Sequence, residues 1–202
     1  MALSETDIAN WALDLIGETP ITDLNASVER AEDLLRAWPS TRDRLLRRHV
    51  FHFAKRRKKI AAAASTPSFG YAYAYAIDAD VARVLMVGDS YPAAVLSDYV
   101  GAPTETWTIE DGHILTDLVA PLPVIWTVNS TPVGAWDPCF ARLMACDLAD
   151  RVAVRITASE SIKTRIAAER REAVSEAVRS NAIELPPRQI ADGSWLATRS
   201  TV

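Results

Sequence analysis

The spacing of apolar residues changes twice along this 202-residue chain, and that change limits the possible folds more than any other feature. Apolar residues recur at helical spacing up to residue 52, alternate over roughly residues 53–130, and return to helical spacing up to residue 182. Since helices and strands each bury one face only at their own period, the middle of the chain cannot share the conformation of its ends. The sequence predicts an α+β protein with a sheet inserted between helices.

Two helices are expected before the inserted sheet. The first is capped at Ser4 and ends at Gly17, a residue type that commonly follows the last helical turn. The second begins at Asn25 or Ser27 and carries its apolar stripe past Pro39. Because proline removes one backbone donor from a helix, Pro39 either kinks a single long helix or divides it into two.

The middle of the chain has the pattern of short antiparallel strands. Tyr71, Tyr73 and Tyr75 alternate with alanine, which places the three rings on one side of a strand, in the sheet core or at an interface. An Asp-Gly pair within residues 110–113 stands between two apolar runs and predicts a tight hairpin. Gly, Pro and Asp clusters separate the other runs, so a small antiparallel sheet is expected.

Two further helices are expected after the sheet. Asp137 followed by Pro138 is typical of an N-cap and the first helical residue. Thr157 and Glu160 then predict a capping box for the last helix. Residues 183–202 have no periodicity and contain two consecutive prolines, which favours an extended arm.

Together these segments predict a helical bundle of two N-terminal and two C-terminal helices, with an inserted antiparallel β-subdomain and an extended C-terminal arm. The expected parts are residues 1–52 for the first two helices, 53–135 for the β-subdomain, 136–182 for the last two helices and 183–202 for the arm. The N-terminus lacks the basic, continuously apolar pattern of a signal peptide, and no apolar run reaches the roughly 20 residues of a membrane span. We therefore expect a cytosolic chain without a membrane span.

Charge is distributed in blocks, although the net charge is only −4. Residues 1–41 contain eight acidic residues against two arginines, residues 42–59 contain nine basic residues against Asp43 alone, and residues 60–140 contain nine acidic residues against Arg83. Segregation of sign along a chain usually marks an assembly surface or a charged polymer as partner. The basic block consists of Arg42, Arg44, Arg47, Arg48, Lys55, Arg56, Arg57, Lys58 and Lys59.

The basic block surrounds a short aromatic stretch, and three interpretations of it stay open. Val50, Phe51 and Phe53 could fill the core where a helix meets the sheet, with the basic side chains on a solvated rim. The same bases could instead neutralise the phosphates of a nucleic acid, with an affinity that falls steeply with salt. They could also contact an acidic face of a neighbouring subunit, where opposite potentials set the register.

Catalytic and cofactor signatures are missing from the sequence. Cys139 and Cys146 lie seven residues apart on one expected helix, too far apart for a disulfide, and neither is next to a histidine. His49 and His52 have a helical metal-ligand spacing but no third ligand near them, and basic residues surround them. The glycines are scattered, so there is no phosphate-binding loop. We expect no enzyme activity, no metal and no cofactor.

Four stretches, taken in order, resemble a known family. They are ETDIANWALDLIGETPITDLN, an opening helix with a Gly-x-x-Pro-Ile loop; RDRLLRRHVFHFAKRRKKIA, a helix that enters the first strand; TPSFGYAYAYAIDADVARVLMV, a tyrosine-rich strand; and DGSWLATR near the C-terminus. In this order they are similar to the tail tubular protein A family of tailed bacteriophages, the head-to-tail adaptors that join the portal to the tail.

The resemblance implies a structural protein of the virion, located at the head–tail junction and made in the host cytoplasm. It implies a homo-oligomeric ring below the portal protein, a dodecamer under a twelve-fold portal, through which genomic DNA passes without specific binding. A tail nozzle or tail tube protein is the implied partner on the other side. The isolated chain can still be monomeric, because the portal could template the ring.

The acidic block suits the wall of such a passage. A wall with few Lys and Arg side chains repels phosphate weakly and does not grip the DNA that slides along it. We therefore expect part of the segment 78–117 to line the DNA channel. The acidic residues concerned are Asp78, Asp80, Asp89, Asp98, Glu105, Glu110, Asp111 and Asp117.

The arm carries the expected docking residues. Pro186 and Pro187 favour an extended conformation of low entropy, and Trp195 is a large apolar anchor with Arg199 near it. We expect these four residues to dock on the portal or on an adjacent subunit. Two rival functions stay open, namely a cytoplasmic DNA-binding protein that uses residues 42–59 and another phage ring component such as a stopper.

Overall fold

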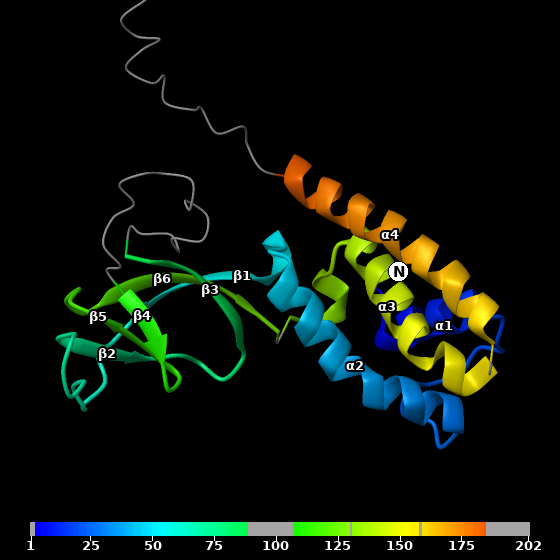
Figure 1. The fold of residues 1–202 in the computed structure, drawn as a ribbon, viewed down its shortest axis with the longest axis horizontal. Helices are drawn as coiled ribbons and strands as arrows, with labels where there is room; N and C mark the ends of the chain where they lie inside the picture. The colour runs from blue at the N-terminus through cyan, green and yellow to red at the C-terminus, as the bar shows by residue number, and fades with distance from the viewer. Residues whose placement is uncertain (1–2, 89–106, 130, 158, 185–202) are drawn as a thin grey trace, which may run out of the picture.

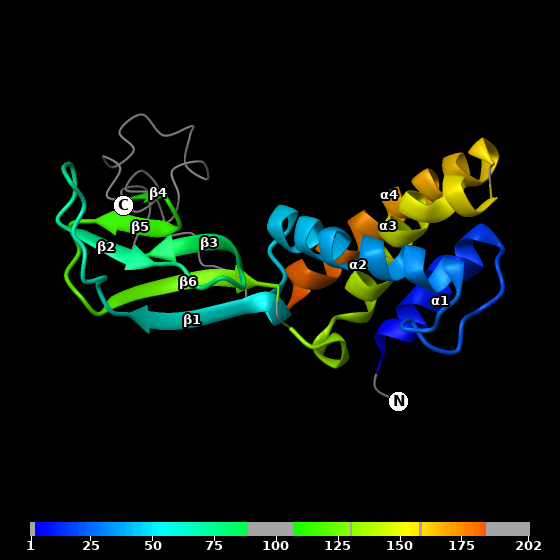
Figure 2. The ribbon, with the colours of Figure 1, turned by 90° about the horizontal axis from the view of Figure 1, so that it is seen from below.

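The computed structural model describes residues 3–88, 107–129, 131–157 and 159–184. These residues form a helical lobe and a β lobe that lie end to end (Figures 1 and 2). The chain leaves the helical lobe once, builds the β lobe, and then returns. The α+β class predicted from the change of period is confirmed.

The helical lobe contains α1 (Glu5–Ile16), α2 (Glu29–Arg48), α3 (Pro138–Thr157) and α4 (Glu160–Ile183). Each of the other three helices contacts α3, whose buried residues lie around the helix and not along one stripe. One apolar core therefore joins helices from both ends of the chain. Within the described residues, no helix is long and apolar enough to cross a bilayer.

The predicted caps of α1 and α3 are confirmed. A backbone N–H in the first turn of α1 donates to the Ser4 hydroxyl at 3.1 Å, and Gly17 follows the helix with a φ of 79°. Asp137 accepts hydrogen bonds from two backbone N–H groups in the first turn of α3, at 2.7 and 3.2 Å. Pro138 is the first residue of that helix, a position where its missing N–H is not needed.

The predicted start of α2 at Asn25 or Ser27 is wrong. The helix begins at Glu29 after Val28, and no side chain caps it. Asn25 belongs to the preceding turn, because its backbone N–H donates to Asp23 Oδ1 at 2.8 Å. A local side-chain bond thus competes with the helix and delays its start.

Pro39 lies inside α2 and does not divide it. The ring removes the N–H that would have bonded the carbonyl of Leu35, one turn earlier. Pro39 is exposed and Leu35 is 41 % exposed, so that carbonyl lies on the side of the helix that water can reach. Of the two alternatives, a single long helix is the one that forms.

The predicted capping box at Thr157 and Glu160 is wrong. Thr157 is the last residue of α3, and its hydroxyl donates to the carbonyl of Ala153 at 2.7 Å. It therefore ends one helix and does not begin the next. α4 begins at Glu160 after Ser159, and no side chain caps it.

Two three-stranded antiparallel sheets make up the β lobe, where the sequence predicted one sheet. Sheet A has the order β1–β6–β3, formed by β1 (Lys55–Ile60), β6 (Leu122–Val128) and β3 (Val81–Val87). Sheet B has the order β2–β5–β4, formed by β2 (Tyr73–Ala76), β5 (His113–Thr116) and β4 (Trp107–Glu110). Residues from both sheets share a second apolar core, so the sheets pack as two layers (Figure 2).

The predicted hairpin joins β4 to β5. Asp111 and Gly112 have φ values of 45° and 70°, both positive as a tight primed turn requires. In β2, Tyr75 is fully buried between the sheets and Tyr73 packs against the same core, while Tyr71 precedes the strand. Two of the three alternating tyrosines therefore contribute to the core of the lobe.

An aromatic cluster joins the two lobes. The chain passes from α2 to β1 through Phe51 and Phe53, whose ring centroids lie 4.7 and 4.9 Å from that of Phe140 in α3. On the way back from β6 to α3, Trp136 places its ring 4.9 Å from the same phenylalanine. Both chain crossings thus pack on one ring of the helical core. We call Phe51, Phe53, Trp136 and Phe140 the aromatic junction.

Hydrogen bonds fix the outgoing crossing. The side chain of Asn181 in α4 accepts from the backbone N–H of His52 at 2.9 Å and donates to the carbonyl of Val50 at 2.8 Å. An amide that satisfies a donor and an acceptor of one segment holds that segment in a single conformation. The Arg47 guanidinium also donates to the carbonyl of Ala82 in β3 at 3.1 Å, which ties α2 to sheet A.

Replacing Phe51 with alanine should lower the free energy of unfolding by about 3–5 kcal/mol, because a buried ring is removed from the aromatic junction. Phe69→Ala is the matched control: Phe69 is 88 % exposed, so its loss should change that free energy by less than about 0.5 kcal/mol. Chemical denaturation followed by circular dichroism measures both variants. Equally small effects would contradict the role given to the junction.

Candidate interaction surfaces

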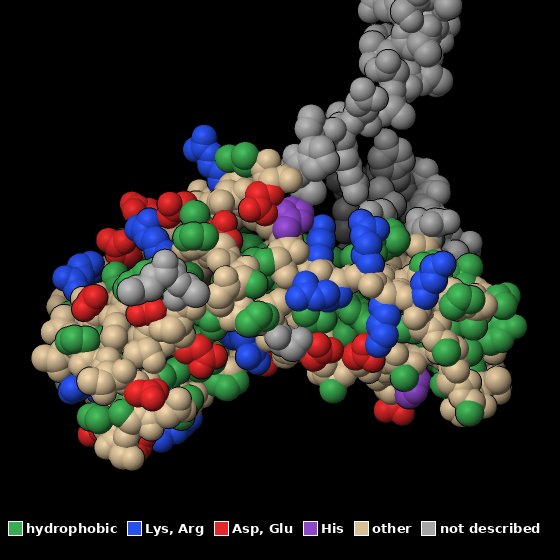
Figure 3. All heavy atoms as spheres, turned by 180° about the vertical axis from the view of Figure 1, so that it is seen from behind, with side chains coloured by type: hydrophobic (Ala, Val, Ile, Leu, Met, Phe, Trp, Pro, Cys, Tyr) green, Lys and Arg blue, Asp and Glu red, His purple; other side chains and the backbone are tan. Residues whose placement is uncertain are grey.

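The basic block divides between two elements of the structure. Its first four residues lie on the C-terminal half of α2, and its last five form most of β1. Figure 3 shows Lys and Arg side chains gathered on the back of the β lobe and near its junction with the helical lobe. The two groups have different partners.

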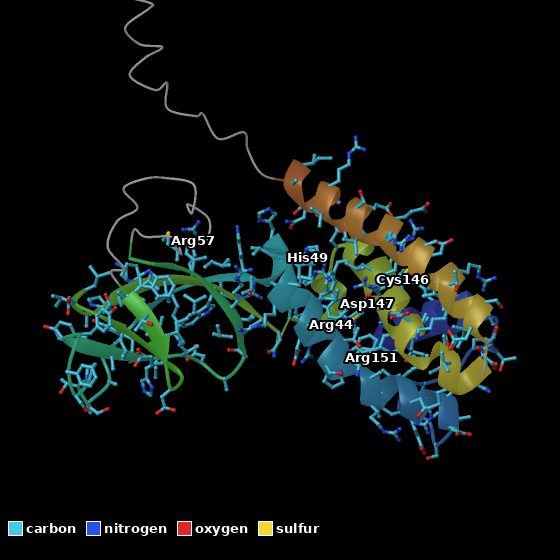
Figure 4. The ribbon with its side chains drawn as sticks, viewed as in Figure 1. Arg44, His49, Arg57, Cys146, Asp147 and Arg151 are labelled. Carbon is cyan, nitrogen blue, oxygen red and sulfur yellow. The ribbon has the colours of Figure 1, made fainter. Side chains whose placement is uncertain are left out.

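On the helical side, Arg44 holds a fully buried carboxylate, Asp147 (Figure 4). Arg44 Nη2 lies 2.9 Å from Asp147 Oδ2, and Arg170 of α4 pairs with the other carboxylate oxygen. The hydrogen bond to Asp147 raises the pKa of Arg170. Three helices meet at this cluster, and a buried charge with both oxygens paired has a structural role.

A second buried carboxylate, Asp33, lies nearer the start of α2. It accepts from Arg36 at 3.1 Å and from Arg155 of α3 at 2.9 Å. Sequence reasoning missed both clusters. The signal that could have found them is an acidic residue inside an apolar helical run, since such a position requires a buried cationic partner.

The other arginines of the helical group have local partners or stay exposed. Arg42 Nε pairs with Asp43 at 2.9 Å, and Arg47 is bonded to β3 as described above. Arg48 is exposed. Burial lowers the pKa of the neighbouring His49, and the charge of Arg48 lowers it further, so this imidazole is neutral near pH 7.

The strand group lies on an edge of sheet A. Among the described strands β1 pairs only with β6, and Arg56, Arg57, Lys58 and Lys59 are all exposed. Lys58 donates to Asp78 at 2.6 Å, a half-exposed ion pair worth at most about 1 kcal/mol. Positive charge on an edge strand also opposes edge-to-edge aggregation.

The core-and-rim interpretation describes the centre of the basic block. Phe51 is buried in the helical core, Phe53 packs partly buried against it, and exposed bases surround them. Val50, which was expected in the core, is only half-buried, and its carbonyl accepts a hydrogen bond from Asn181. The exposed bases of β1 stay accessible, as the other two interpretations require.

The acidic residues expected to line a channel lie at separate places on the β lobe. Asp78 and Asp80 lie in the turn before β3, Glu110 and Asp111 lie at the β4–β5 hairpin, and Asp117 follows β5. All but the half-buried Asp80 are exposed. Other predicted site residues lie outside the described part of the chain: Asp89, Asp98, Glu105, Pro186, Pro187, Trp195 and Arg199.

The described residues contain no group of three or more His, Cys, Asp or Glu side chains that could hold a metal ion. Burial raises the pKa of Cys146 to about 11, so its thiol is protonated at neutral pH. Burial also raises the pKa of Cys139, which is half-buried. Thiols in this state are poor nucleophiles.

No protein-family model matches this chain, and no curated protein matches it.

Replacing Asp147 with asparagine should lower the free energy of unfolding by about 3–5 kcal/mol, because Arg44 and Arg170 lose the carboxylate that neutralises them. Asp43→Asn is the matched control, since it breaks an ion pair of a half-exposed carboxylate worth at most about 1 kcal/mol. Urea denaturation of both variants gives the two values. If they are equal, the Asp147 cluster does not hold the three helices together.

Proposed function

We propose that this chain is a non-enzymatic structural adaptor of a tailed bacteriophage, a subunit of the ring that joins the portal to the tail. One observation carries the proposal: a helical lobe and a β lobe are tied end to end at the aromatic junction, and exposed charge of opposite sign occupies different surfaces of the β lobe. A subunit of this kind spans two partners and offers complementary sides to its neighbours. The resemblance of four stretches to the tail tubular protein A family supports the same function.

In this proposal the helical lobe docks beneath the portal protein, and the β lobe continues the tube toward the tail nozzle or tail tube protein. Copies pack side by side in the assembled virion, twelve of them under a twelve-fold portal. Interfaces of this obligate kind usually bury more than about 2,000 Å² in total. Apolar burial supplies most of the free energy, because an exposed ion pair contributes at most about 1 kcal/mol.

Genomic DNA passes through the ring in this proposal and is not bound specifically. Some of the exposed acidic residues of segment 78–117 face it, so phosphate is repelled weakly along the wall. The proposal assigns Trp195 and Arg199 of the arm to docking on the portal or on the adjacent subunit.

Replacing Trp195 with alanine should weaken binding to the cognate portal protein by about thirty-fold or more, the effect of losing a buried aromatic anchor. Thr198→Ala, in the same arm, is the matched control and should bind as the unchanged chain does. Co-sedimentation of the full chain with portal assemblies measures all three. Undiminished binding of the W195A variant would remove the docking role, and failure of the unchanged chain to bind would remove the adaptor proposal.

A DNA-binding protein is the second candidate, favoured by the four consecutive exposed bases Arg56–Lys59. The adaptor proposal expects the isolated chain to bind duplex DNA only non-specifically, with a Kd of about 10⁻⁴–10⁻⁶ M at physiological salt. Fluorescence anisotropy with a labelled duplex measures this affinity. Nanomolar binding that disappears when Arg57 and Lys59 become glutamate would favour the DNA-binding function instead.

A further inference from the structure

The outer face of sheet A is basic. Side chains alternate between the two faces of a strand. Arg56 and Lys58 of β1 pair with core residues of β6, so they lie on the side of sheet A that faces sheet B. The alternate residues Lys55, Arg57 and Lys59 therefore lie on the side away from sheet B.

Arg83 of β3 extends this face, because it pairs with the same β6 residue as Lys55. The strands of sheet A contain six basic residues and no acidic one. Within the described residues, Arg57, Lys59 and Arg83 have no ion pair. Figure 3, which views the lobe from this side, shows Lys and Arg side chains around hydrophobic ones. We call Lys55, Arg57, Lys59 and Arg83 the basic face.

Sheet B has acidic residues at its outer surface. Glu110 and Asp111 line a groove of about 420 Å³, and Phe69 lies at the same groove. Residues 61–80 and 107–121, which form sheet B and its adjoining loops, contain no Lys or Arg. We call the groove formed by Phe69, Glu110 and Asp111 the acidic groove.

The basic face and the acidic groove lie on opposite sides of the β lobe. Tyr75 and Ile114 of sheet B point into the core between the sheets, and the alternate residues Ala74 and Leu115 line the groove. The groove therefore opens away from sheet A. Figure 2 shows the two sheets as separate layers, which places one charged surface outside each layer.

We propose that the basic face of one copy of this chain binds the acidic groove of a second copy, with Arg57 and Lys59 meeting Glu110 and Asp111. Different surfaces of identical chains then meet, so each bound copy still offers a free basic face on one side and a free groove on the other. Repetition of such a contact gives a ring when the rotation between copies closes. The inference rests on the proposed function, because it names the contact between ring subunits.

In this contact apolar burial supplies most of the binding free energy, and charge sets the rate and orientation of the encounter. Phe69 is 88 % exposed at the groove, so covering its ring is favourable and anchors the contact. The ion pairs add little free energy one by one, but they speed encounter and exclude a contact between two like surfaces. Glu110 and Asp111, counted above among the expected channel residues, are assigned here to the subunit contact.

A nucleic acid on the basic face explains less of the structure. It would leave the acidic groove and the exposed Phe69 ring without a partner, and the acidic residues would repel its phosphates. A second copy satisfies both surfaces at once. Charge complementarity between opposite sides of one lobe therefore favours self-association.

Site-directed cross-linking tests this contact in the full chain. One preparation carries Arg57→Cys and the other Glu110→Cys, and a short bis-maleimide joins chains that meet in the mixture. We expect a cross-linked dimer that forms about ten-fold faster or more than with the Glu172→Cys control, because Lys59, Asp111 and the Phe69 anchor remain to bring the two cysteines together. Glu172 is an exposed acid of α4, and the chain without new cysteines measures the background from Cys139.

A charge-exchange experiment provides the second measurement. The R57E/K59E and E110R/D111R variants should each be monomeric in sedimentation velocity at low salt, because each places like charges at the contact. Their mixture should form alternating oligomers, since the reversed face of the first variant meets the reversed groove of the second, and the unchanged face of the second meets the unchanged groove of the first. Circular dichroism confirms that both exposed double variants are folded.

With the cognate portal protein present as a template, equal cross-linking of R57C to E110C and to E172C would overturn the contact, as would a mixture of charge-exchanged variants that stays unassembled. Suppose that the unchanged chain binds duplex DNA, that R57E/K59E abolishes this binding, and that R57C and E110C do not cross-link. This result would assign the basic face to nucleic acid and would also overturn the subunit contact. The outcome is separable from that of the proposed function. Portal binding without the R57C–E110C cross-link would reject this contact alone, and the cross-link without portal binding would reject only the adaptor role.

Discussion

The packing of Phe51, Phe53 and Trp136 on Phe140 is the interaction on which the rest of this structure depends. A lobe inserted between two helices is connected by two chain crossings, and both pack here on one ring of α3, with centroids 4.7–4.9 Å apart. Asn181 of α4 adds hydrogen bonds to the outgoing crossing. Because the cluster belongs to the helical core, the direction of the β lobe is set by the same packing that stabilises the helices.

The fixed position of the β lobe also determines which way its charged side chains face. Alternation along β1 divides consecutive bases between two sides, and the pairing with β6 decides which of them face outward. With the lobe held in place, Arg57 and Glu110 point in opposite directions from the same two-layered structure. Not every residue of the basic block is available for a partner. Arg44 pairs with the buried Asp147, together with Arg170, and so stabilises the helical lobe from within.

Local signals predicted the parts of the fold that depend on neighbouring residues. The caps at Ser4 and Asp137 and the turn at Asp111 form as expected, because a few adjacent groups satisfy them. The capping box predicted at Thr157 does not form, since a hydroxyl can bond backward into its own helix as well as cap the next one. The apolar run around Asp147 signals a buried carboxylate, but its partners could not be assigned, because they come from helices distant in the sequence. The same holds for the division into two sheets, which alternation alone does not specify.

The central claim is that opposite charge on two sides of a firmly attached β lobe lets identical copies close around a passage for DNA. Electron microscopy of the full chain mixed with its cognate portal protein tests that claim most directly. We expect rings stacked on the portal around an open axial channel, with the basic faces and acidic grooves between neighbouring subunits and other acidic residues of segment 78–117 toward the channel. Portals that stay bare among single unassembled molecules, or rings that carry these acidic residues only on their outer wall, would contradict it.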